Sequence, residues 1–215
     1  MKEITVKAYA KINLSLDVLG KRPDGYHEIL TVMEQVDLFD LVKVSWTKGG
    51  QETGVFLKSN LPFLPSDSEN IAYKAAELMV KKYGNDIAAG RIRTEKPDKT
   101  EDADPAFQTE DSQNTGRIDI EIEKRIPVAA GLAGGSANCA AVLHALNRLW
   151  DLNLDLETLM KLGSELGADV PFCLAGQAAL NEELLLSRDA LAGTCALASG
   201  IGEKLELVPP LKALI

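Results

Sequence analysis

PVAAGLAGGSANCAA, at residues 127–141, is the most informative stretch of the chain. Before it, residues 118–122 alternate isoleucine with acidic residues, which predicts a half-buried strand. After it, residues 136–149 are rich in alanine and leucine, which predicts a helix. Gly131, Gly134 and Gly135 therefore lie in a strand-to-helix turn, where glycine permits positive φ and close approach of another group. The first-turn N–H groups of such a helix carry about half a positive charge and can bind a polyphosphate. A turn that only connects the two elements is the alternative.

Composition describes an ordinary globular protein and excludes several classes of partner. The 215 residues are 46% hydrophobic and 26% charged, with a net charge of −9. Nucleic-acid binding depends on clustered cations, so we expect no nucleic-acid partner. No apolar run reaches the ~18 residues of a membrane span, and the N-terminus lacks a signal-peptide core, so we expect no membrane partner. The oligomeric state is left open.

Cysteine and histidine usage favours the cytoplasm and gives no metal motif. Cys139, Cys173 and Cys195 are odd in number and far apart, which argues against a disulfide framework and favours a reducing compartment. The two histidines, His27 and His144, belong to no zinc-binding motif. The sequence identifies no metal ligands.

The N-terminal third is predicted to form a largely antiparallel sheet. Apolar residues occupy the even positions from 4 to 18, which indicates one long strand or two consecutive strands. Lys11 and Asn13 then lie on the face opposite the core, where a solvated strand face is the simplest interpretation. The RPDG turn at residues 22–25 is followed by Tyr26 and His27 at a strand start. This pair either faces a ligand or packs half-buried. Further strands are expected at 29–36, 41–46 and 55–58.

The middle of the chain is predicted to contain a helix and then a polar insertion. Ser66 and Glu69 have capping-box spacing, so a helix is expected from there to about Tyr83, with Gly84 ending it. Residues 85–116 differ in composition from the rest, and the part at 94–116 is charged, contains proline and is nearly free of large apolar side chains. Such a segment cannot bury enough surface to fold, which predicts a disordered or loosely held insertion. An acidic docking segment is the alternative.

The C-terminal third is predicted to continue with helices and a final hairpin. Asp155 is expected to cap a helix over residues 156–166. Asp169 follows in a tight connection, because Pro171 favours extended backbone at the residue before it. An Asx-turn or helix cap is the simplest role for Asp169. Residues 177–192 are expected to form a short amphipathic helix, and 194–207 a strand, a glycine turn and a second strand.

Four segments occur together in one order: AYAKINLSLDVLGKRPDGYHEI, IEKRIPVAAGLAGGSANCAA, LGADVPF and ASGIGEKL. Their combination resembles the GHMP small-molecule kinases, and among them those that act on 4-diphosphocytidyl-2-C-methyl-D-erythritol. The resemblance covers about residues 4–84, 117–176 and 193–210. It implies an α+β fold with a sheet-rich GHMP-kinase N-terminal domain and helices packed on one side.

The resemblance also implies a domain division. Residues 1–176 would form the ATP-binding domain with the insertion at 85–116, and residues 177–215 the incomplete start of a C-terminal domain. Most of the family's C-terminal domain, including a later glycine-rich motif, is expected to be missing after Ile215. The chain would then be a fragment, a partial reading frame or an incompletely functional protein.

The implied activity is ATP-dependent phosphorylation of the erythritol 2-hydroxyl of diphosphocytidyl-methylerythritol, a step of non-mevalonate isoprenoid synthesis. Lys11 and Asp169 match the family's catalytic residues. Asn13, Tyr26 and His27 match positions that bind the substrate. The loop that would hold the ATP phosphates comprises Pro127, Val128, Ala129, Ala130, Gly131, Leu132, Ala133, Gly134, Gly135, Ser136 and Ala137.

The implied chemistry suits these residue types. A carboxylate such as Asp169 can receive the hydroxyl proton, and Lys11 can offset charge that develops on the transferred group. Tyr26 offers a stacking surface for the base, and His27 offers hydrogen bonds to its edge. The loop has no lysine of its own, so Mg²⁺ and residues such as Lys11 must supply the cations. The Ser136 hydroxyl would contact phosphate or Mg²⁺.

Departures from the family pattern keep two alternatives open. Ala129, Ala130 and Ala133 stand where many relatives have glycine, and Leu197 stands where relatives often have an aromatic residue. The chain could be a non-catalytic nucleotide-binding module left by truncation, or a GHMP kinase for another small alcohol. The Tyr26–His27 pair after the RPDG turn argues against the second alternative.

Overall fold

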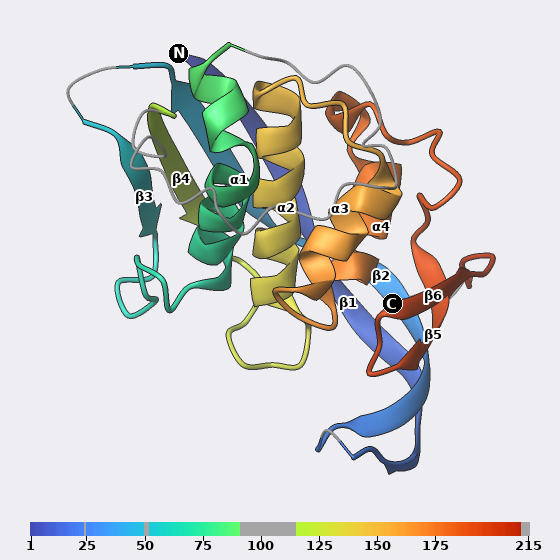
Figure 1. The fold of residues 1–215 in the computed structure, drawn as a ribbon. Coiled ribbons are helices and arrows are strands. Elements are labelled where there is room, and N and C mark those ends of the chain that lie inside the picture. Colours follow the sequence, from blue (N-terminus) through green and yellow to red (C-terminus); the bar gives the residue numbers. More distant parts are fainter. Residues whose placement is uncertain (24, 50–51, 91–114, 212–215) are drawn as a thin grey trace.

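The computed structural model describes residues 1–23, 25–49, 52–90 and 115–211 (Figure 1). Within these ranges the chain forms one mixed sheet and four α-helices. The strands are β1 (Lys2–Lys21), β2 (His27–Thr47), β3 (Gly54–Ser59), β4 (Arg117–Glu123), β5 (Cys195–Gly200) and β6 (Lys204–Leu207). The helices are α1 (Ile71–Ala88), α2 (Gly134–Leu149), α3 (Leu156–Ser164) and α4 (Val170–Leu180), with a 3-10 turn, η2 (Glu182–Leu184).

β2 is the central strand of the sheet. One edge of β2 pairs with β1 along nearly its whole length. The other edge pairs with β5 through residues 29–34 and with β4 through residues 41–47. These pairs are antiparallel, as is β5 with β6, whereas β3 lies parallel to β4. The expected largely antiparallel sheet is therefore confirmed.

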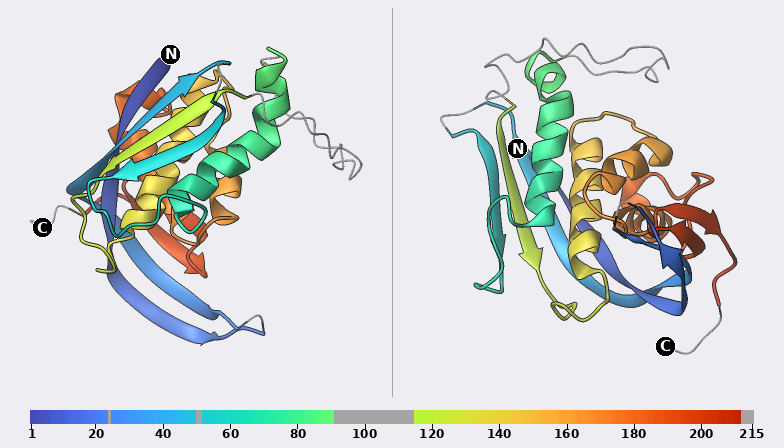
Figure 2. Two further views of the ribbon diagram at one scale, coloured as in Figure 1. Left: turned by 90° about the vertical axis from the view of Figure 1, so that its left-hand side faces the viewer. Right: turned by 60° about the horizontal axis from the view of Figure 1, so that its bottom comes forward.

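The helices form a layer on one face of this sheet (Figures 1 and 2). α2 is the central helix, and most of its residues are buried because the sheet, α1 and α4 surround it. Small alanines on α2 allow this close packing, while Leu143 and Leu146 fill the remaining space. The predicted α+β arrangement, with helices on one side, is confirmed. None of the helices in the described ranges has the length and apolarity needed to cross a membrane.

The first two strands continue beyond the helical layer as a curved arm, which includes residues 12–23 and 25–28 (Figure 2). The predicted alternation of buried and exposed residues holds where β1 lies under the helices, since Val6, Ala8 and Ala10 are buried. It fails in the arm, where Leu16 and Val18 are more than half exposed. The register of β1 against β2 shifts between Tyr9 and Lys11, between Asn13 and Ser15, and again near the tip. Each such irregularity changes which face the following side chains occupy.

Lys11 departs from the prediction for this reason. It is only 5% exposed, so it does not lie on a solvated strand face. Asn13, two residues further along, is exposed as expected.

Helix α1 begins and ends later than predicted. Its N-cap is Asn70, whose side chain accepts a 3.0 Å hydrogen bond from the N–H of Ala72, so the capping box at Ser66 and Glu69 is wrong. The helix also passes through Gly84 and continues to Ala88. A Cβ at Gly84 would lie 2.6 Å from a methyl group of Thr115, so this glycine makes room for a contact instead of ending the helix.

The C-terminal third follows the prediction in part. Asp155 caps α3 through its carboxylate, and β5 and β6 form the expected hairpin. Val170 is helical instead of extended, because proline is tolerated in the first turn of a helix, where its missing N–H is not needed.

The amphipathic helix expected at 177–192 is wrong. α4 extends only to Leu180, and Asn181 then bonds both the N–H and the carbonyl of Lys7 on β1, which turns the chain into η2. Of the predicted insertion at 85–116, residues 91–114 lie outside the described residues. The domain boundary after residue 176 stays a prediction.

Candidate active site

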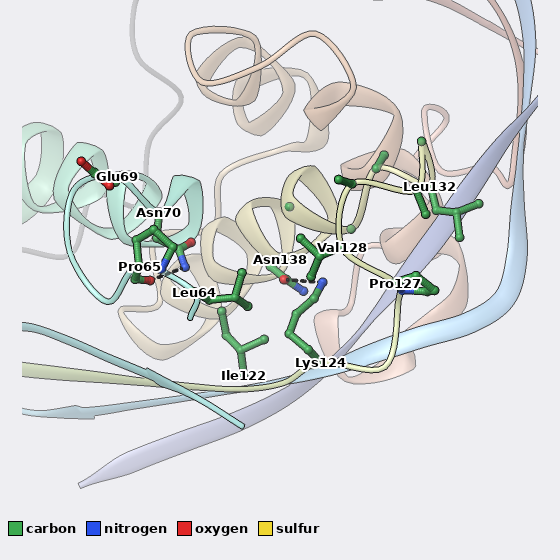
Figure 3. Close-up of a pocket in the computed structure, with 16 residues that line it drawn as sticks. Leu64, Pro65, Glu69, Asn70, Ile122, Lys124, Pro127, Val128, Leu132 and Asn138 are labelled. Carbon is green, nitrogen blue, oxygen red and sulfur yellow. Dashed lines mark hydrogen bonds between the residues drawn. The ribbon is translucent and has the colours of Figure 1, made fainter. Parts of the chain in front are cut away.

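The glycine-rich loop between β4 and α2 borders a pocket of about 340 Å³ (Figure 3). Residues 127–135 form one wall, and the segment that precedes α1, including Leu64 and Asn70, forms the opposite wall. α2 begins after Ala133, with no side chain capping its N-terminus and no acidic residue in its first turn. The first N–H groups of α2 have no partner within the helix and border the pocket, as the sequence predicts for a phosphate site.

Two alanines of this loop adopt the left-handed conformation. Ala129 has φ 59° and Ala133 has φ 55°, while Gly131, between them, has φ 75°. In this conformation the alanine Cβ lies too close to the following carbonyl oxygen, which costs about 1–2 kcal/mol of free energy per residue. Two of the three alanines that replace glycine in this loop, Ala129 and Ala133, therefore occupy positions where glycine would be unstrained.

Lys124 supplies a cation beside the loop, although the loop itself contains no lysine. Its ammonium group contacts the buried carboxylate of Asp40. The same group lies 3.3 Å from Oδ1 of Asn138, and Figure 3 shows this second contact. A Cβ at Gly134 would lie 2.9 Å from Nζ of Lys124, so the ammonium is adjacent to the first residue of α2. Sequence reasoning missed this residue. The available signal was a lysine three residues before the loop, at the end of the predicted strand.

Lys11 and Asp169 lie together at the other side of the loop. Nζ of Lys11 is 3.4 Å from Oδ1 of Asp169, and it donates a 2.7 Å hydrogen bond to Oδ1 of Asn13. Asp169 is the N-cap residue of α4, but its carboxylate makes no capping hydrogen bond and its side chain is 33% exposed. The backbone N–H of Lys11 donates a 3.1 Å hydrogen bond to the carbonyl of Leu132. The structure thus brings Lys11, Asn13 and Asp169 to the edge of the glycine-rich loop.

Neighbouring polar groups fix the orientation of this cluster. The amide of Asn13 donates a 2.7 Å hydrogen bond to the hydroxyl of Thr31, which donates in turn to the carbonyl of Ser15. One helical turn after Asp169, burial raises the pKa of the Cys173 thiol; the negative charge of Asp169 raises it further, and Lys11 lowers it. Cys173 is thus an inert neighbour and not a nucleophile.

Tyr26 and His27 lie far from this cluster along the chain. His27 begins β2 and pairs with Lys21, whereas Lys11 pairs with Gln35, so ten residues of β1 separate the two sites. At about 3.3 Å per residue this is on the order of 30 Å along the strand. Tyr26 is 61% exposed, so half-buried packing does not account for it. The structure does not bring these two residues into the Lys11–Asp169 cluster.

Of the predicted loop residues, Ser136 and Ala137 are not among those that line the pocket, and Ala137 is fully buried. Leu197 lies on β5, where it pairs with Val32 of β2 and Glu206 of β6. Within the described ranges, no three or more His, Cys, Asp or Glu side chains gather closely enough to hold a metal ion. Cys139, Cys173 and Cys195 are all buried free thiols.

Comparison with known proteins places this geometry in a family. The profile of the GHMP kinases N terminal domain matches residues 102–177, which include the glycine-rich loop and Asp169. A 4-diphosphocytidyl-2-C-methyl-D-erythritol kinase of Alkaliphilus metalliredigens is 44% identical over 180 residues, 84% of this chain and 51% of that protein. A protein of the same name from Clostridium botulinum is 41% identical over 207 residues, 96% of this chain and 56% of that protein.

The chain contains a GHMP kinase N-terminal domain. A crystal structure of a 4-(cytidine 5'-diphospho)-2C-methyl-D-erythritol kinase has a TM-score of 0.60 at 33% identity, over 95% of this chain and 55% of that one. The homoserine kinase of Cytophaga hutchinsonii, at 20% identity and a TM-score of 0.53, shares the fold. The chain spans about half the length of the curated relatives it matches.

Proposed function

We propose that the chain forms the ATP-binding part of a kinase that phosphorylates the erythritol 2-hydroxyl of 4-diphosphocytidyl-2-C-methyl-D-erythritol. Relatives of that name, 40–44% identical over most of the chain, support this substrate. The observation that carries the proposal is the Lys11–Asp169 pair. It lies at the edge of the glycine-rich loop and is joined to that loop by the hydrogen bond from Lys11 to Leu132.

In this proposal Asp169 receives the proton of the attacking hydroxyl. The alcohol oxygen bonds to the γ-phosphorus of ATP, the bond from that phosphorus to the β–γ bridging oxygen breaks, and ADP leaves. The proton passes to the Asp169 carboxylate, one oxygen of which faces Lys11 at 3.4 Å. Lys11, held by Asn13 and nearly buried, places a fixed positive charge where the transferred group gains negative charge.

The loop and its neighbours would bind the triphosphate. The free N–H groups at the start of α2 border the pocket, and Lys124 places an ammonium group beside them. Mg²⁺ is usually held by substrate phosphates together with one or two protein oxygens, and the partly exposed carboxylate of Asp169 fits that role. The resemblance adds the hydroxyl of Ser136 as a second oxygen. Bound Mg²⁺ would neutralise charge on the phosphates.

The arm would bind the cytidine portion. Tyr26 and His27 are exposed at its tip, where an aromatic ring and an imidazole can stack on a base and bond its edge. Because they lie about 30 Å along the strand from Lys11, one substrate can touch both groups only if the curved arm brings its tip towards the loop. The three buried free cysteines suit a cytoplasmic location.

The test measures turnover of 4-diphosphocytidyl-2-C-methyl-D-erythritol with Mg-ATP, and the readout is the release of ADP. Asp169→Asn and Lys11→Met are each expected to lower kcat by at least about 100-fold. Glu157→Gln and Lys161→Met form the matched control, because these residues make an exposed ion pair on α3. Retained turnover in both site variants would remove the assignment. ATP binding by calorimetry without turnover would instead support the nucleotide-binding module. Preference for mevalonate or homoserine would support another GHMP kinase.

A further inference from the structure

We infer that Asp40 is a positioning residue, which holds Lys124 and the start of the glycine-rich loop in the geometry needed to bind phosphate. The part of this inference that concerns ATP rests on the proposed function. Asp40 lies on β2, its side chain is fully buried, and it therefore cannot touch a ligand in the pocket. Whatever it contributes must act through the groups bonded to it.

Both carboxylate oxygens of Asp40 are used by residues around the loop. Oδ1 accepts the N–H groups of Arg125 at 2.7 Å and Ile126 at 2.8 Å. Oδ2 accepts the amide of Asn138 at 2.8 Å and contacts the ammonium group of Lys124. Three of these donors belong to the segment that leads from β4 into the loop, and the fourth belongs to α2, which follows the loop.

This arrangement fixes the loop at both of its ends. Residues 124–126 directly precede Pro127, and Asn138 lies in the second turn of α2. The buried carboxylate of Asp40 therefore connects the segment that precedes the loop to the helix that follows it. A charged acceptor with four donors is a strong anchor, since hydrogen bonds to charged groups are about twice as strong as neutral ones.

The same carboxylate sets the position of Lys124. The side chain of Lys124 is 5% exposed, so its ammonium group is not free to move through solvent. Asp40 and Asn138 hold it beside Gly134, where even a methyl group would lie within 2.9 Å of Nζ. The cation is thereby kept next to the free N–H groups of α2, and a phosphate entering the pocket meets both together.

The test compares Asp40→Asn, Lys124→Met and the double variant with the wild-type chain. In Asp40→Asn we expect faster hydrogen exchange at residues 125–133 and a Kd for Mg-ATP raised by about 10-fold or more, the factor that corresponds to 1.4 kcal/mol. The buried lysine is left without its counterion in this variant, so the double variant should be more stable than Asp40→Asn. The increase in its Kd should nonetheless be smaller than the product of the two single increases, because part of the effect of Asp40 acts through Lys124.

Asn147→Ala is the matched control. Asn147 is also a buried polar anchor on α2, but it bonds the backbone of Leu154 at the end of the helix away from the pocket. This variant should lose stability without changing exchange at 125–133 or the Kd for Mg-ATP. An equal change in Kd in this control would show that general destabilisation, and not positioning, explains Asp40→Asn, and would overturn the inference.

Two further outcomes decide the remaining cases. If Asp40→Asn does not fold, Asn138→Ala is used in its place, because it keeps the carboxylate of Asp40 and removes one of its hydrogen bonds. Unchanged hydrogen exchange at residues 125–133 in that variant overturns the inference. If the wild-type chain does not bind Mg-ATP, the proposed function fails, and exchange alone decides the role of Asp40. Faster exchange in Asp40→Asn then supports its role as the anchor of the loop, and unchanged exchange refutes it.

Discussion

The backbone N–H of Lys11 donates a hydrogen bond to the carbonyl of Leu132, while the side chain of the same lysine reaches Asp169. One residue of β1 thus contacts both the glycine-rich loop and the first residue of the α4 segment. These two segments are separated by α2 and α3 in the sequence. The position of the Asp169 carboxylate relative to the glycine-rich loop therefore depends on Lys11 in β1.

Lys11 and Asp169 should act as one unit. Combining Lys11→Met with Asp169→Asn is expected to lower kcat no more than about 3-fold below the worse single variant, because each loses most of its role without the other. Single-turnover rates for the four proteins of this cycle provide the measurement. Multiplied effects would mean that the two side chains contribute independently.

Ala133→Gly should stabilise the chain. Ala133 has φ 55°, a conformation that glycine adopts without strain, so we expect the free energy of unfolding to rise by about 1 kcal/mol. Ala130→Gly is the control, because Ala130 is not among the residues with positive φ and glycine there only adds freedom to the unfolded chain. Urea unfolding curves of the two variants should shift in opposite directions.

Gly163→Ala should destabilise the contact between α3 and α4. A Cβ at Gly163 would lie 2.8 Å from a methyl group of Val170 and 2.9 Å from one of Leu174, both buried. Overpacking of this kind costs about 1–3 kcal/mol. Gly20→Ala, in the arm, has open space around the new methyl group and should change the free energy of unfolding by less than about 0.5 kcal/mol. Equal midpoints in thermal unfolding would contradict the expected tight packing.

His144 should make stability dependent on acid pH. Complete burial lowers the pKa of His144 to about 4, although its hydrogen bond to the carbonyl of Leu174 acts in the opposite direction. The unfolded chain binds this proton below about pH 6.5, whereas the folded chain does not. The stability associated with neutral His144 is therefore intact above pH 6.5 and decreases as the pH falls towards 4.

The measurement is the free energy of unfolding at about pH 7.5 and about pH 5, where His144 should account for a loss of about 2 kcal/mol. His144→Gln should remove that part of the loss. Asn147→Ala, which removes a buried and non-titratable side chain from the same helix, serves as the control and should lower stability equally at both pH values. The same loss in wild type and His144→Gln would assign the acid sensitivity to other groups.

Local patterns in the sequence predicted the elements that flank the site. Alternating isoleucines gave β4, and the alanine- and leucine-rich run gave α2, because strand and helix periods differ. The burial of Lys11 could not be predicted in this way, since register irregularities in β1 depend on its pairing with β2.

Asp40 was missed for a related reason. Its partners follow it by 84 to 98 residues in the sequence, so no local pattern connects them. β2 contains several acidic residues, and nothing in the sequence around Asp40 shows that it faces a buried lysine and not solvent. Only the fold, which places the end of β4 and the start of α2 against β2, distinguishes the two cases.

The contact between Gly84 and Thr115 joins the last turns of α1 to the beginning of β4. Because Gly84 and Thr115 are in contact, the chain between them is a loop whose two ends meet. The entropic cost of closing a loop grows only with the logarithm of its length, by about 0.6 kcal/mol for each doubling. Evolution, or an engineer inserting a tag or a sensor domain, can therefore lengthen or shorten the chain between these two residues at small thermodynamic cost to the sheet and the helices.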